Sequence, residues 1–168
     1  MPGVPVQEIG PFAEHSPEQE RPLGSYAILI GAFSTATAGF GVWLRCTDRS
    51  LPETVDVRDL LLITVATHKA TRLLGRDRVT SVIRAPFTRF QGDAGPGEVD
   101  EAARGAGLRR AIGELIICPY CMGMWAAAGF TAGLIATPRA TRWIATALTT
   151  VAGADVLQIV YAKAEGTL

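Results

Sequence analysis

The sequence lacks most of the features that reveal a protein's chemistry. Charged residues make up only 19% of its 168 residues, and the formal net charge is zero, whereas a soluble domain is about one quarter charged. A basic surface for nucleic acid is therefore missing, and we expect no nucleic-acid partner. The sequence also contains no phosphate-binding glycine motif, no HExxH motif and no convincing Ser-His-Asp pattern. These absences favour a non-enzymatic protein.

Long uncharged stretches are what the sequence has instead. Residues 26–44 and 115–138 contain no charged side chain, and residues 143–162 contain only Asp155. A helix that crosses a bilayer needs about 20 mainly apolar residues. The sequence therefore predicts an all-α, polytopic transmembrane helical protein rather than a soluble domain.

About four spans are expected, within a transmembrane helical domain over residues 25–163. The expected spans are roughly 25–45, 57–75, 118–137 and 142–163. Residues 1–24 are rich in proline and glutamate and too polar to pack, so we expect a disordered acidic tail. That tail has no basic start before an apolar core, so it is not typical of a signal peptide, and the first span is expected to be retained.

The second span is the least apolar of the four. His68, Lys69 and Arg72 lie inside residues 57–75. Spanning requires these basic side chains to extend toward the interface, as long basic side chains near a helix end do. An amphipathic helix lying on the membrane surface is the alternative.

The distribution of arginine and lysine orients the four spans. The tail, the loop over residues 76–112 and the C-terminus share one side, which carries nine basic residues against five on the other. Basic residues accumulate on the cytoplasmic side of membrane proteins. We therefore expect a bacterial inner-membrane protein with both termini in the cytoplasm.

The loop over residues 76–112 is predicted to lie at the cytoplasmic membrane surface. Apolar residues between Val79 and Phe90 recur at near-helical spacing, as in an amphipathic segment that contacts lipid. Its candidate lipid-headgroup ligands are Arg76, Arg78, Arg84 and Arg89. An ordinary loop packed on the helices is the alternative, and the glycine-rich residues 92–107 are expected to be a mobile linker.

Cys118 and Cys121 form a CxxC pair in the stretch IICPYCMGMW. Pro119 suits the first position of a helix, so Cys118 is expected near the N-cap, where a thiolate is stabilised. A redox dithiol is one interpretation, although a standing disulfide is not expected in a reducing cytoplasm. A zinc site is the second, with His68 or a second subunit completing the four ligands. A helix start with two buried thiols is the third, and it involves no cofactor.

A second polar constellation is expected inside the membrane. His68 and Asp155 each lie seven residues from the cytoplasmic end of their spans, which is about 10 Å at 1.5 Å per residue. A carboxylate at that depth needs a partner, and Arg72 or Lys69 is the natural counter-ion. An ion pair that fixes helix register and a proton or ion relay both remain open.

Five segments carry a resemblance to a known family. They are ATHKATRLLGRDRVTSVIRAPF (66–87), GEVDE (97–101), GLRRAIGELIICPYCMGMW (107–125), PRATR (138–142) and ADVLQIVYA (154–162). The chain resembles a bacterial membrane-protein family known as domain of unknown function 1360, which includes a Bacillus sporulation protein. The resemblance implies motif positions at His68, Arg72, Arg84, Cys118, Cys121 and Asp155. It implies no reaction, because the family has no established activity.

Together these observations predict a non-enzymatic assembly or interaction subunit of the inner membrane. Its expected partners are membrane lipids and other membrane proteins, in a homo- or hetero-oligomer. Two alternatives stay open. One is a membrane thiol-redox or metal-binding protein that uses Cys118 and Cys121, and the other is a small proton or ion conductor built on Asp155.

Overall fold

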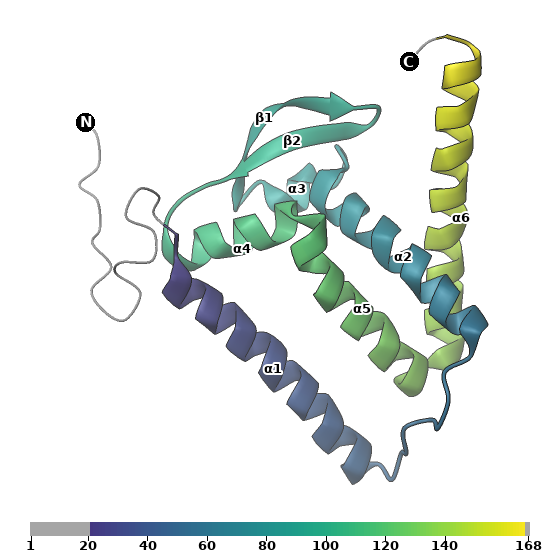
Figure 1. Cartoon of the computed structure of the whole chain (residues 1–168). Coiled ribbons are helices and arrows are strands. Elements are labelled where there is room, and N and C mark those ends of the chain that lie inside the picture. The colour runs from purple at the N-terminus through teal and green to yellow at the C-terminus, as the bar shows by residue number, and fades with distance from the viewer. Residues whose placement is uncertain (1–20, 167–168) are drawn as a thin grey trace.

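The computed structural model describes residues 21–166, so most of the tail predicted over residues 1–24 lies outside the described residues. The described residues form six helices and one two-stranded sheet (Figure 1). The helices are α1 (Leu23–Cys46), α2 (Val57–Arg76), α3 (Ser81–Arg84), α4 (Gly107–Ile117), α5 (Pro119–Ala136) and α6 (Pro138–Ala164). The strands are β1 (Thr88–Gly95) and β2 (Glu98–Ala103). The fold is mostly helical, as predicted, and departs from the all-α prediction only by this small sheet.

Two of the described helices, α1 and α6, are long and apolar enough to cross a membrane. Helices α4 and α5 are bent by 82° at the break between them and add a third candidate if they count as one span. Helix α2 is not a candidate by length and composition, because its 20 residues include five charged ones. Only 6% of the most apolar stretch of α1, and of α6, is buried inside the protein.

Helices α2, α5 and α6 form a bundle, with α5 between α1 and α2 (Figure 1). Ile63 and Ala66 of α2 and Ala145 of α6 are its buried centre. Helices α2 and α6 run parallel, because Asp59 of α2 contacts Arg142 of α6 near their first turns, and Lys69 of α2 contacts Asp155 of α6 further along both helices. Partly buried side chains surround this centre, namely Leu62, Phe130, Leu134 and Leu148.

Local sequence explains where these helices begin and end. Asp56 caps α2 by accepting a hydrogen bond from the Arg58 N–H at 2.7 Å. Pro119 and Pro138 occupy the first turns of α5 and α6, where the missing N–H costs nothing. Pro138 also disfavours helical geometry at Thr137, and α5 accordingly ends at Ala136.

A β-hairpin occupies the segment that the sequence predicted to be a mobile linker. Strand β1 pairs antiparallel with β2, with Thr88 opposite Ala103 and Phe90 opposite Glu101. Gly95 and Gly97 have φ angles of 141° and 76° at the turn, a conformation that glycine adopts without strain. The glycine-rich composition of residues 92–107 therefore serves a tight turn and bulged strands, so the prediction of a linker is wrong.

Candidate functional site

The hairpin, helix α3 and their connections form a small polar unit at one end of the bundle. We call residues 77–106 the hairpin cap. It lies at the end where α2 finishes and α5 begins (Figure 1). Thr80 of the cap donates a hydrogen bond from its hydroxyl to the Leu73 carbonyl oxygen at 2.5 Å, so the cap is tied directly to the last turns of α2.

Arg84 is the centre of the hairpin cap. Its side chain is 0% exposed, and all of its guanidinium N–H groups face acceptors. Arg84 Nε and Nη2 donate to Glu101 Oε2 and Oε1 at 3.0 and 3.1 Å. The other acceptors are the carbonyl oxygens of Leu74 and Asp77 and the hydroxyls of Thr80 and Ser81. One side chain thus joins the end of α2, the loop after it, α3 and β2.

Glu101 is the counter-charge of this network. Burial alone would raise the pKa of the Glu101 carboxyl, but hydrogen bonds from Arg84, Thr88 and Ser81, with the Arg84 charge, outweigh it. The pKa of Glu101 therefore lies below its ordinary value of 4.5. The carboxylate is charged at neutral pH and holds Arg84 in place.

Four arginines are predicted to bind lipid headgroups, and they differ in burial and in ion pairing. The prediction is wrong for Arg84, because its guanidinium is fully buried and saturated by protein acceptors. Arg76 and Arg78 form ion pairs with Asp100 and Asp93 of the hairpin at 2.8 and 2.9 Å. Arg89 is exposed on β1. The headgroup role of these three remains a prediction.

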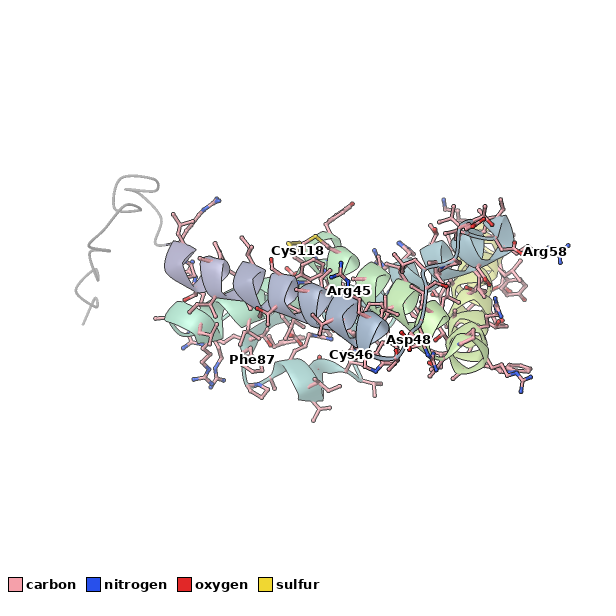
Figure 2. The ribbon with its side chains drawn as sticks, turned by 90° about the horizontal axis from the view of Figure 1, so that it is seen from below. Arg45, Cys46, Asp48, Arg58, Phe87 and Cys118 are labelled. Atoms are coloured by element: carbon pink, nitrogen blue, oxygen red, sulfur yellow. A yellow bond between two sulfur atoms is a disulfide. The ribbon has the colours of Figure 1, made fainter. Side chains whose placement is uncertain are left out.

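Cys118 and Cys121 lie at the bend between α4 and α5 and are joined by a disulfide. Their Cα atoms are 5.2 Å apart, which is within the range that a disulfide bridges. Cys118 is the N-cap of α5, and its sulfur accepts a hydrogen bond from the Cys121 N–H at 3.2 Å. In Figure 2, Cys118 lies on one side of α1 and Phe87, in the hairpin cap, on the other.

The disulfide differs from the sequence-based expectation of a reduced pair. That expectation followed from the predicted cytoplasmic location, whereas the first turn of a helix brings residues i and i+3 onto one face. Cys121 is exposed and Cys118 half-buried. His68, the proposed additional zinc ligand, is exposed on α2. Within residues 21–166, no three or more His, Cys, Asp or Glu side chains lie close enough to hold a metal ion.

The polar residues expected to form one cluster inside the membrane do not all meet, and three of them, Lys69, Arg72 and Asp155, take part in two separate ion pairs. Lys69 Nζ lies 2.5 Å from Asp155 Oδ2, with the two side chains 15% and 44% exposed. Arg72, the other counter-ion considered for Asp155, instead donates to both oxygens of Glu98 in the hairpin cap. Asp155 thus links α6 to α2, and Arg72 links α2 to the hairpin.

Sequence reasoning missed the acidic side of the hairpin cap. Four of its five carboxylates each pair with an arginine that precedes them in the chain. The partners are Arg72 with Glu98, Arg76 with Asp100, Arg78 with Asp93, and Arg84 with Glu101. The signal was present in the segment EVDE (98–101), which follows an arginine-rich segment closely enough to fold back on it.

The fold therefore defines a mostly helical protein with candidate membrane spans and an ion-paired β-hairpin at one end of its bundle. Residues 62–161 match the model of the family described as protein of unknown function (DUF1360), and the chain belongs to this family. The matched region contains the hairpin cap, the cysteine pair and the Lys69–Asp155 pair, and it excludes α1. This match confirms the resemblance found in the sequence.

A relative in Bacillus subtilis (strain 168) is named sporulation protein YjcA. It is 28% identical to this chain over 107 residues, which cover 62% of this chain and 91% of that protein. No solved structure matches the chain.

Proposed function

We propose that this chain is an integral protein of the bacterial inner membrane that acts as a non-enzymatic assembly or interaction subunit. The proposal has four spans, which are α1, α2, α5 and α6. Both termini and the hairpin cap lie on the cytoplasmic side in this arrangement, as the excess of basic residues there favours. Large exposed apolar side chains on α1 and α6, such as Ile30, Trp143 and Val160, are suited to lipid contact.

The charges of α2 do not oppose its role as a span. Its 20 residues are about 30 Å long, which matches the hydrocarbon thickness of a bilayer. Asp59 pairs with Arg142, and Lys69 pairs with Asp155. Among the described residues, these pairs neutralise the charges of α2 that lie away from the hairpin cap, apart from Arg58 in its first turn. Paired charges cost less in a membrane than isolated ones.

The observation that carries the interaction role is that charged side chains of the hairpin cap bind one another, while apolar side chains of the same cap stay exposed. Four carboxylates of the cap bind arginines that fix its shape. The fifth, Asp77, accepts a hydrogen bond from the Val79 N–H at 2.8 Å, and among the described residues no three or more His, Cys, Asp or Glu side chains lie close enough to hold a metal ion. The α3 region meanwhile exposes Val79, Val82 and Ile83 at 82%, 77% and 58%. An ordered polar cap with uncovered apolar residues suits contact with another membrane subunit, either the same chain or a different one.

Two measurements on the native chain test this proposal. Resistance to alkaline carbonate extraction of the membranes tests integral insertion, and release into the supernatant would contradict it. Labelling with a membrane-impermeant maleimide tests topology through Cys46, the exposed free cysteine at the end of α1. We expect Cys46 to be labelled in intact spheroplasts, and Cys46→Ser is the control. Labelling only after the cells are opened would overturn the predicted orientation.

The interaction role has its own test in Val82→Asp. We expect this variant to remain in the membrane but to lose proteins that co-purify with the wild-type chain after chemical crosslinking. Gln91→Asp, at an exposed position of β1, is the matched control because it adds the same charge away from α3. Equal recovery of crosslinked partners with all three proteins would contradict the role assigned to α3.

Thiol–disulfide exchange is a second candidate function, favoured by the disulfide between Cys118 and Cys121. A thiolate of a reduced partner protein would attack exposed Cys121 Sγ and release Cys118 as a thiolate, which the N-terminus of α5 stabilises. The partner's second thiol then breaks the mixed disulfide. The partner is oxidised by two electrons, and both cysteines of this chain end reduced.

Cysteine variants separate the two functions. Cys118→Ser and Cys121→Ser should leave complementation intact if the protein acts by assembly alone. Loss of complementation in both, with normal membrane levels, would favour exchange. Cys118→Ser leaves Cys121 as a lone thiol, which can capture a partner only in the reverse of this step, by attacking the disulfide of an oxidised partner and releasing one partner thiolate. A mixed disulfide with an oxidised partner in Cys118→Ser, and none in Cys121→Ser, would identify Cys121 as the sulfur that exchanges with the partner.

A further inference from the structure

Three arginines near the hairpin cap have no acidic partner among the residues that the structure describes. Eight arginines lie between residues 72 and 110, and five of them pair with carboxylates. The remaining three are Arg89, Arg104 and Arg109. Among residues 21–166, none of these three has a carboxylate within ion-pair distance. Within the part of the chain that the structure describes, their positive charges are therefore uncompensated, although nearby carboxylates pair with every other arginine of this region.

These three arginines gather at one corner of the cap, where α3 leads into β1. Arg109 Nε donates to the Pro86 carbonyl oxygen at 2.7 Å. The Arg104 backbone N–H donates to the Phe87 carbonyl oxygen at 2.9 Å. Arg89 follows two residues after Phe87 and lies opposite Ala102 in the ladder. We call Arg89, Arg104 and Arg109 the basic corner.

Contacts between α4 and the first turn of α1 place the basic corner close to the point where α1 begins. A Cβ on Gly107, at the start of α4, would lie 3.9 Å from Ser25 Oγ. The Tyr26 hydroxyl donates to Glu114 of α4, which also accepts from Arg110 Nε at 2.9 Å. Since α1 is one of the two candidate spans, its first turn marks the edge of the membrane, and Arg109 is two residues from Gly107. The basic corner is thus placed at the depth of lipid headgroups.

We propose that the basic corner binds the phosphate groups of anionic membrane lipids. The inference rests on the membrane placement proposed above. A guanidinium matches a phosphate with two parallel N–H···O bonds, and cations beside the cytoplasmic leaflet gain from its negative surface potential. The corner differs from the set predicted from sequence, because Arg76, Arg78 and Arg84 are neutralised by hairpin carboxylates and only Arg89 is shared. Free phosphate has the same chemistry and is the competing source.

Native mass spectrometry of the full-length chain in detergent tests the proposal, with phosphatidylglycerol as the probe and phosphatidylcholine as the neutral lipid. The test variant is R89Q/R104Q/R109Q. The matched control is R45Q/R58Q/R139Q, which removes three arginines without a carboxylate partner among the described residues. Arg45 and Arg58 lie at the far end of α1 and the start of α2 (Figure 2). We expect phosphatidylglycerol to bind the test variant at least about tenfold more weakly than the wild type, and the control within about twofold.

Three outcomes would overturn the basic corner. They are equal loss of phosphatidylglycerol in both variants, equal loss of phosphatidylcholine in the test variant, and displacement of the lipid from the wild type by millimolar inorganic phosphate. Circular dichroism shows whether the test variant is folded, and R89K/R104K/R109K keeps the charges if it is not. The lysine variant should bind phosphatidylglycerol better than the glutamine variant but below the wild type. Carbonate extraction distinguishes a failure of the basic corner from a failure of the proposed membrane insertion, because release of the wild-type chain from the membrane contradicts insertion itself.

Discussion

Arg84 and Glu101 form a buried, two-point ion pair that connects α3 to β2. Their guanidinium and carboxylate contact each other through two hydrogen bonds of 3.0 and 3.1 Å, and their side chains are 0% and 5% exposed. Thr88 adds a hydrogen bond to Glu101 at 2.7 Å. The pair determines the shape of the hairpin cap, because the same arginine also binds carbonyl oxygens at the end of α2.

Glu101→Gln is expected to destabilise the hairpin cap by about 3–5 kcal/mol, because it leaves a buried guanidinium without its counter-charge. Hydrogen exchange of the amides in residues 88–103 measures this, since local opening of the hairpin exposes them. The control is Arg78→Gln, which removes an exposed pair with Asp93 and is expected to cost less than about 1 kcal/mol. Equal exchange in both variants would contradict a structural role for the buried pair.

The same carboxylate predicts how the stability of the cap depends on pH. The folded pKa of Glu101 lies below the ordinary 4.5, so its stabilisation is fully present above about pH 4.5 and is lost as pH falls through the folded value. Exchange of the hairpin amides, corrected for intrinsic pH effects, should therefore accelerate below pH 4.5. In Glu101→Gln this dependence should be weaker. An identical dependence in the two proteins would show that other groups control it.

The sequence predicted the helical elements better than the cap. Uncharged stretches produce an unmistakable signal, and helices lie at all four expected positions. The hairpin was missed because glycine and acidic residues dominate residues 92–101, and this composition is also typical of a linker. The segment is ordered by the antiparallel ladder together with the pairing of those carboxylates with the preceding arginines, and these contacts are not visible in its composition.

The burial of Arg84 could not be recognised from spacing alone. In the sequence it is one of four arginines in an amphipathic segment, and the side chain of each could reach a headgroup. What distinguishes Arg84 is a set of acceptors from α2, the loop after it, α3 and β2, including Leu74 and Glu101. Such long-range contacts exist only in the folded chain. The disulfide likewise differs from the expectation, because the predicted cytoplasmic location disfavours it whereas the first turn of α5 brings the two sulfur atoms together.

Two helical glycines are predicted to be intolerant of a methyl group. A Cβ on Gly75 would lie 2.7 Å from the Ile116 carbonyl oxygen, and one on Gly113 would lie 2.5 Å from the Phe87 carbonyl oxygen. Both contacts are with backbone, so alanine at either site should cost about 1–3 kcal/mol. Gly129→Ala is the control, because nothing lies within 4 Å of its added Cβ. Thermal unfolding in detergent should rank Gly129→Ala at or above the wild type and both other variants below it.

Lys69 and Asp155 are predicted to hold α6 in register against α2. Asp155→Ala leaves the mostly buried Lys69 ammonium without its partner at 2.5 Å, and we expect a loss of about 1–3 kcal/mol, less than for a fully buried pair. The double variant Lys69→Met/Asp155→Leu removes both charges and should recover most of this loss. Its recovery, measured by thermal unfolding and by membrane levels, identifies a structural pair. A double variant that is as stable as the wild type but fails to complement would instead show that the charges themselves are needed, as a proton or ion relay requires.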